Sequence, residues 1–139
     1  MNHEEQAAVA VVMNFLDSYA GRSVEGCMSV IAASTPILLF GTNDNEVFRT
    51  TEEVRAAFTK DFAGMTNICW GKRRNIHVES VSTLASVIFE LPISYQHDGK
   101  DVETLIRYAL TLTKEDEQWK ICSGTASVPL AAETYSFPQ

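Results

Sequence analysis

The strand-like stretch WKICSGTAS carries hydroxyl side chains where apolar ones are expected. Trp119 and Ile121 begin an apolar face at every second position, and the same face continues with Ser123, Thr125 and Ser127. A hydroxyl that is buried without a hydrogen-bond partner costs about 1–3 kcal/mol. We therefore expect the core face to open into a pocket at this end of the strand, where hydroxyls could meet a ligand or water.

Other reactive residue types show no catalytic or metal-binding pattern. Cys27, Cys69 and Cys122 match no zinc or redox spacing, so we expect reduced thiols, no metal and no cofactor. His77 has an odd sequence number in a strand-like segment whose apolar residues, Trp70, Ile76 and Val78, have even numbers. It is expected to face away from a pocket unless the register shifts.

Composition and charge limit the partners of this chain. Its 139 residues, 45% hydrophobic and 21% charged, predict one globular domain over residues 1–139. The net charge of −7 repels nucleic acid and anionic lipid, and we interpret the basic run 72–74 as solvated side chains. No apolar run reaches the roughly 20 residues that span a bilayer, and no signal peptide is evident, so we expect a cytoplasmic protein.

These side chains must be positioned by helices in the first half of the chain and strands in the second. Apolar spacing predicts a helix over 4–20, a shorter one after Ser23 and a third from Thr50 to Gly64, where Thr50 and Glu53 match a capping box. From residue 67 onward the pattern indicates strands at 67–79, 84–96, 101–114 and 118–128.

The turn 97–100, with Asp-Gly at its centre, predicts a tight hairpin. Pairing its ends places Phe89 opposite Tyr108 on one face and Glu90 opposite Arg107 on the other.

A second turn at 116–117 predicts the register of the last strand. That register places Leu110 opposite Ser123 and Tyr108 opposite Thr125. The hydroxyls would then share the core face of the sheet with Tyr108.

The chain resembles the SnoaL-like branch of the nuclear transport factor 2-like superfamily. The segments that carry the resemblance are FLDSYAGRSVEGCMSVIA, FGTNDNEVFRTTEEVRAAF and IRYALTLTKEDEQWKICSGTAS. The resemblance implies an α+β, cystatin-like cone, in which a curved antiparallel sheet wraps around N-terminal helices and encloses a cavity. It does not imply one activity, because this superfamily includes isomerases, cyclases, dehydratases and non-enzymatic scaffolds.

The acid–base residues of known relatives are missing from the matching positions. Phe15 stands where ketosteroid isomerases have their oxyanion tyrosine, and the run 39–41 holds no carboxylate where their aspartate falls. Ser123 and Thr125 stand where many SnoaL-like relatives carry histidines. Asp44 and Glu46, in a hairpin that can border the cavity in this fold, are the only catalytic carboxylates we consider, with turn formation as the alternative. No catalytic residue is assigned.

The resemblance and the hairpin registers together define two candidate sites. Tyr19 either points its hydroxyl into the cavity or is an ordinary core tyrosine. The expected ligand pocket consists of Phe15, Tyr19, Phe40, Trp70, Phe89, Tyr108, Ser123 and Thr125. The opposite face of the sheet carries small, mostly uncharged residues and is expected to form a homodimer interface through Glu90, Arg107, Ala109, Thr111 and Cys122.

We therefore expect a homodimer that binds a small apolar or aromatic molecule in an internal pocket. One alternative is a scaffold that uses the sheet face for oligomerisation, resembling the association domain of calcium/calmodulin-dependent kinase II. Another is a SnoaL-like cyclase or isomerase with a non-standard acid or base.

Overall fold

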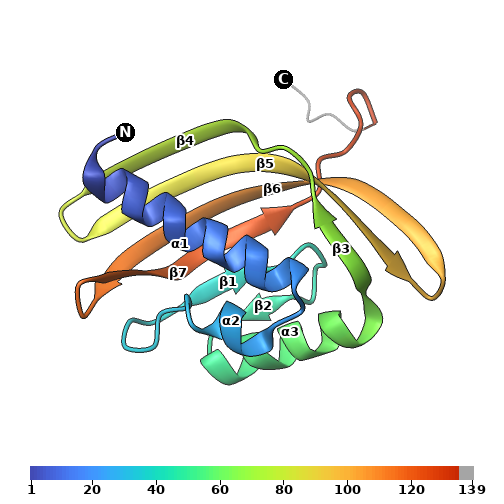
Figure 1. Ribbon diagram of the computed structural model, residues 1–139, viewed down its shortest axis with the longest axis horizontal. Helices are drawn as coiled ribbons and strands as arrows, with labels where there is room; N and C mark the ends of the chain where they lie inside the picture. Colours follow the sequence, from blue (N-terminus) through green and yellow to red (C-terminus); the bar gives the residue numbers. More distant parts are fainter. Residues whose placement is uncertain (135–139) are drawn as a thin grey trace.

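The computed structural model describes residues 1–134, which form three helices and one curved sheet (Figure 1). The helices are α1 (His3–Ala20), α2 (Val24–Met28) and α3 (Thr51–Gly64). The strands are β1 (Leu38–Phe40), β2 (Val47–Phe48), β3 (Thr66–Trp70), β4 (Arg74–Val81), β5 (Leu84–His97), β6 (Lys100–Glu115) and β7 (Gln118–Ser127).

The two long helices begin at capping boxes. Asn2 accepts a hydrogen bond from the backbone N–H of Glu5 at 2.8 Å, and the Glu5 carboxylate accepts one from the Asn2 N–H at 2.9 Å. Thr50 and Glu53 make the same reciprocal pair at the start of α3, as the sequence predicts. Each pair satisfies N–H groups that a helix cannot satisfy itself, and so fixes where the helix starts.

The helices cover the concave face of the sheet, with α1 lying across the long strands and α3 beside β2 and β3 (Figure 1). The strand order is β2-β1-β7-β6-β5-β3, and β4 also pairs with β5. The expected α+β cone is confirmed, with one difference. The sheet is mixed rather than antiparallel throughout, because β1 runs parallel to β7. Within the described residues, no helix is long and apolar enough to cross a membrane.

The β5–β6 hairpin has the predicted register along its whole length. Phe89 pairs with Tyr108, and Glu90 pairs with Arg107. The tip adopts positive φ at Asp98 and Gly99, as the Asp-Gly sequence indicates. The aromatic pair therefore faces the helices, and the ion pair lies on the outer face.

The predicted register of β7 is right at its start and wrong beyond Cys122. Leu112 pairs with Ile121 as expected, but a β-bulge then inserts one residue. Beyond it, Thr111 pairs with Ser123, Leu110 with Gly124, Ala109 with Thr125 and Tyr108 with Ala126. The bulge moves Ser123 to the outer face and aims Gly124 and Ala126 at the helices instead. Thr125, beside Phe40 of β1, no longer lies opposite Tyr108 but still borders the cavity.

Gly124 permits this bulge. Its φ is +149°, and a Cβ at this position would lie 2.3 Å from the carbonyl oxygen of Ala109. Such an approach is impossible without movement of the β6 backbone. A glycine is therefore required where the two strands change register.

We expect Gly124→Ala to lower the free energy of unfolding by more than about 2 kcal/mol, because it combines backbone strain with a clash against β6. Chemical denaturation measures this loss. Ser123→Ala, at the neighbouring position on the outer face, is the control and should change stability by less than about 1 kcal/mol. Equal stability of both variants would show that the bulge does not depend on glycine.

Candidate functional site

A cavity of about 320 Å³ lies between the helices and the concave face of the sheet and extends to the turn between β1 and β2. Its aromatic lining comes from both the helices and the sheet. These residues are Phe15, Tyr19, Phe40, Phe48, Phe58, Trp70, Tyr95 and Tyr108. Aliphatic side chains such as Ile31, Leu110 and Ile121 complete the apolar wall.

The bulge in β7 contributes to this space. Gly124 and Ala126 line the cavity opposite Leu110 and Tyr108, where larger side chains would fill it. The opening of the core that the sequence predicts near residues 123–127 therefore exists. It arises from small residues rather than from hydroxyls on the core face.

The aromatic side chains around Tyr19 pack against one another. The Tyr19 ring centroid lies 5.0 Å from that of Phe62 and 5.8 Å from that of Trp70. The Trp70 indole N–H donates to the carbonyl oxygen of Leu16 at 2.8 Å, which fixes the ring in place. The Tyr19–Phe62 pair is edge-to-face and the Tyr19–Trp70 pair is tilted, and such packing makes a wall of defined shape.

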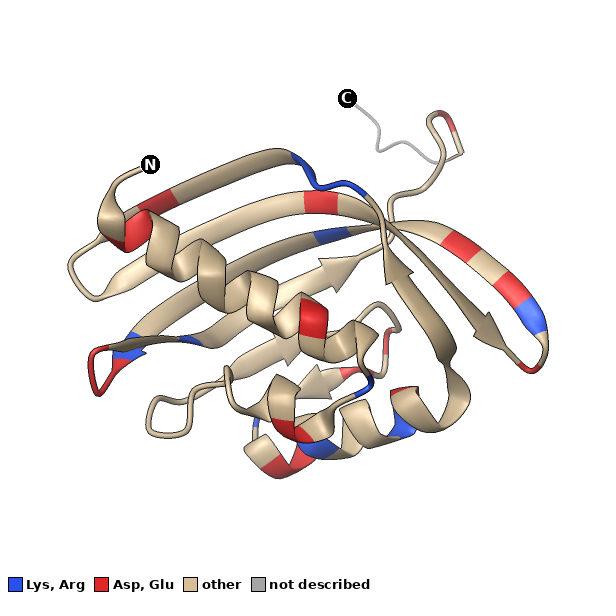
Figure 2. Ribbon diagram, viewed as in Figure 1, with Lys and Arg blue, Asp and Glu red and all other residues tan. Residues whose placement is uncertain are grey.

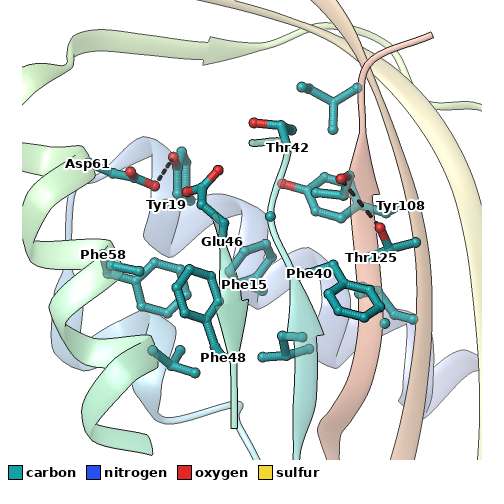
Figure 3. A pocket seen from close by; sticks show the side chains of 18 of the residues that line it. Phe15, Tyr19, Phe40, Thr42, Glu46, Phe48, Phe58, Asp61, Tyr108 and Thr125 are labelled. Atoms are coloured by element: carbon teal, nitrogen blue, oxygen red, sulfur yellow. Dashed lines mark hydrogen bonds between the residues drawn. The ribbon is translucent and has the colours of Figure 1, made fainter. Parts of the chain in front are cut away.

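Two polar groups from different helices meet inside the aromatic wall. The Tyr19 hydroxyl on α1 donates a hydrogen bond of 2.8 Å to Oδ2 of Asp61 on α3 (Figure 3). Burial raises the pKa of the Asp61 carboxyl, the nearby charge of Glu46 raises it further, and the Tyr19 hydrogen bond opposes both. Burial, followed by the charge of Asp61, also raises the pKa of Tyr19. Tyr19 is therefore a neutral hydrogen-bond donor to a partly desolvated carboxyl group.

Glu46 supplies a second carboxylate from the β1–β2 turn. Its Oε1 accepts the backbone N–H of Asn43 at 2.8 Å, and its side chain folds over Gly41, where a Cβ would lie 2.8 Å from it. Figure 3 shows this carboxylate directed toward Tyr19 and Asp61. The turn thus places a carboxylate at the border of the cavity.

Tyr108 and Thr125 add two further hydroxyls. Tyr108 stacks on Phe89 at 5.4 Å, and burial raises its pKa. Thr125 lies next to its β1 partner Phe40, which is 46% exposed, so both border the cavity at its rim.

Six of the eight expected pocket residues line the cavity: Phe15, Tyr19, Phe40, Trp70, Tyr108 and Thr125. Two do not. Phe89 is only 2% exposed because it lies beneath Tyr108, and Ser123 lies on the outer face because of the bulge. Among the acid–base candidates, Glu46 lines the cavity, whereas Asp44 is outside it and His77 is exposed on β4.

Asp61 is the functional candidate that sequence reasoning missed. It lies seven residues after Val54 and three after Phe58, on the helical stripe that packs into the core. It also lies in the last turn of α3, where the helix dipole disfavours negative charge. A carboxylate on an apolar stripe and near a helix C-terminus is the signal that could have identified it.

The expected interface residues surround an ion-paired carboxylate on the outer face. Glu90, only 8% exposed, accepts from Arg107 at 2.8 Å, from Asn75 at 2.8 Å and from Arg74 at 3.2 Å. These bonds, led by that from Arg107, lower the pKa of Glu90. Cys122 is buried, with its thiol 3.5 Å from the carbonyl oxygen of Thr111. Residues 1–134 contain no cluster of three or more side chains that could hold a metal ion.

Comparisons with known proteins agree with this architecture. The fold superimposes on that of a candidate dehydratase of the nuclear transport factor 2-like family from Streptomyces avermitilis, with a TM-score of 0.83 and 17% identity over 92% of this chain and 97% of that one. A ketosteroid isomerase-like protein from Erwinia carotovora atroseptica superimposes with a TM-score of 0.80 and 12% identity, over 94% of this chain and 100% of that one. A candidate scytalone dehydratase from Novosphingobium aromaticivorans superimposes with a TM-score of 0.80 and 14% identity, over 96% of this chain and 89% of that one.

Identities this low establish the fold alone. A comparison with curated proteins found no significant match. The family itself is shown by sequence, because the model of the SnoaL-like domain matches residues 9–131, most of the chain. With its helices, curved sheet and internal cavity in the corresponding arrangement, this protein belongs to the SnoaL-like domain family and has the nuclear transport factor 2-like fold.

Proposed function

We propose that this protein binds a small, mostly aromatic molecule in the internal cavity. The observation that carries the proposal is the combination of an aromatic wall with a few converging polar groups, namely Tyr19, Asp61, Glu46 and Tyr108. A volume of about 320 Å³ is at the lower end of the range for small-molecule sites. The apolar wall would supply most of the binding free energy, and the polar groups would orient the ligand.

Proton transfer within the same cavity is a second candidate function. A carboxyl group with a raised pKa, hydrogen-bonded to a tyrosine and bordering a mostly apolar cavity, has the properties of a general acid or base. Two relatives in fold are named as candidate dehydratases, a reaction class that moves protons. Asp61 would then be the non-standard acid or base, with Tyr19 as its hydrogen-bond donor.

Self-association through the outer face is a proposal that concerns assembly rather than chemistry. Ile88 is 44% exposed there, Ala109 and Thr111 are small, and Glu90 is already paired with arginines. Figure 2 shows carboxylates concentrated on the helices and at the hairpin ends. Because the protein carries a net charge of −7, a second copy can approach with least repulsion over a face whose central carboxylate, Glu90, is already paired with Arg74 and Arg107.

Filling the cavity tests the binding proposal. Ala57 lines the cavity from α3, and we expect Ala57→Phe to occupy the space and reduce binding of the neutral fluorescent probe N-phenyl-1-naphthylamine at least tenfold. Ala56→Phe is the matched control, since Ala56 is the adjacent exposed position of the same helix. Fluorescence titration gives both affinities. Failure of the wild type to bind, or equal binding by the two variants, would contradict the proposal.

Asp61 should reduce stability in a way that depends on pH. Because the folded-state pKa is raised, folded protein binds the proton more tightly than unfolded protein, and stability falls as pH rises from the ordinary aspartate pKa through the raised one. Asp61→Asn should therefore match the wild type at low pH and be more stable at pH 7, by about 0.5–1 kcal/mol for this partly solvated group.

Denaturation curves at several pH values measure this difference. Asp17→Asn removes an exposed carboxylate from α1 and should show no such trend. A loss of stability in Asp61→Asn at pH 7 would mean that the charged form is stabilised in the fold, which would contradict an unfavourable burial of the Asp61 carboxylate.

A charge on the outer face tests self-association. We expect the wild type to be a dimer at micromolar concentration by light scattering, and Ala109→Glu to dissociate it by burying an unpaired charge. Ala56→Glu, an equivalent change on the exposed side of α3, should leave the dimer intact. A wild type that is monomeric at this concentration would contradict the proposed self-association.

A further inference from the structure

The charged groups of the cavity are all of one sign. Asp61 and Glu46 are the only acidic side chains along its wall, and within residues 1–134 no lysine, arginine or histidine lines it. Most of the remaining wall is apolar or aromatic. A ligand that enters therefore meets negative charge without any positive side chain that could pair with an anion.

The hydrogen bonding of Asp61 is incomplete. Tyr19 donates to Oδ2, and no donor among the described residues bonds to Oδ1. Lys60, on the same helix, is exposed, and its charge affects Asp61 less than burial does. Glu46 adds repulsion rather than compensation. A partly buried carboxylate in this position lacks the counter-ion that would offset its loss of water.

The aromatic wall also favours a positively charged ligand over a negatively charged one. Tyr19, Trp70 and Phe58 line the cavity and lie near one another, with the ring centroids of Trp70 and Phe58 at 5.8 Å and 6.2 Å from that of Tyr19. The face of an aromatic ring carries the negative part of its quadrupole, so a ring face attracts a cation that lies over it. Ring faces and carboxylates together are the usual means by which proteins bind ammonium groups. An anionic ligand would meet repulsion from both.

We propose that the ligand of this cavity is a primary or substituted amine, bound in its protonated form, on an aromatic or alkyl body. This inference rests on the proposed function and adds to it the charge of the ligand. The ammonium group pairs with Asp61 and Glu46 near the β1–β2 turn, and the apolar body lies against the aromatic wall. Neutral molecules of the same shape bind more weakly, and carboxylates bind most weakly.

Three ligands of one shape and different charge provide the test: 2-naphthylmethylamine, 2-naphthylmethanol and 2-naphthoate, each titrated by calorimetry at pH 7. We expect the amine to bind at least about tenfold more tightly than the alcohol, and 2-naphthoate to bind least. Asp61→Asn and Glu46→Gln should each weaken amine binding about fivefold or more, and change binding of the alcohol by less than twofold.

Two controls separate this site from general attraction to an acidic protein. Asp17→Asn lowers the negative charge equally but lies outside the cavity, so it should leave amine affinity within twofold. Ala57→Phe should abolish binding of the amine and the alcohol alike. Equal affinities of amine and alcohol, or tightest binding of 2-naphthoate, would overturn the charge inference alone. Absence of binding by all three ligands and by the neutral probe would overturn the proposed function as well.

Discussion

The site depends on one extra residue in the last strand. The bulge at Cys122 exchanges the two faces of β7, so that Gly124 and Ala126 rather than hydroxyls lie opposite Leu110 and Tyr108. Two small residues in the middle of a sheet leave space that the helices do not fill. The contact of Gly124 with the Ala109 carbonyl fixes the position of this register change.

That space has consequences for the polar groups around it. Asp61 lies on the core side of α3 because its helical stripe is otherwise apolar, and the cavity provides the space that a charged or hydrogen-bonding group needs there. In a filled core the same carboxylate would be strongly destabilising. Tyr19 satisfies one of its oxygens, and Glu46 is held nearby by the turn that begins at Gly41. A partly buried carboxylate, Asp61, thus lies beside a cavity that could hold a ligand, and such destabilising groups are common at functional sites.

Sequence patterns predicted the fold because its elements agree with local rules. Capping residues at Asn2 and Thr50 mark helix starts, and Asp98-Gly99 determines a hairpin whose register follows over its whole length. The register of β7 could not be obtained in this way, because a bulge depends on a contact between Gly124 and β6 rather than on local sequence. Asp61 was missed because its role appears only when α1 and α3 bring it to Tyr19. The aromatic lining, by contrast, followed largely from side-chain periodicity and the family resemblance.

The central claim, that the cavity holds a small molecule, is tested most directly by native mass spectrometry of protein purified from the organism that makes it. We expect a population with the mass of the chain plus one small molecule per subunit, and loss of that added mass in Ala57→Phe expressed in the same organism. Retention of the added mass in Ala57→Phe would place the molecule elsewhere. Bare polypeptide mass for the wild type under these gentle conditions would contradict the account.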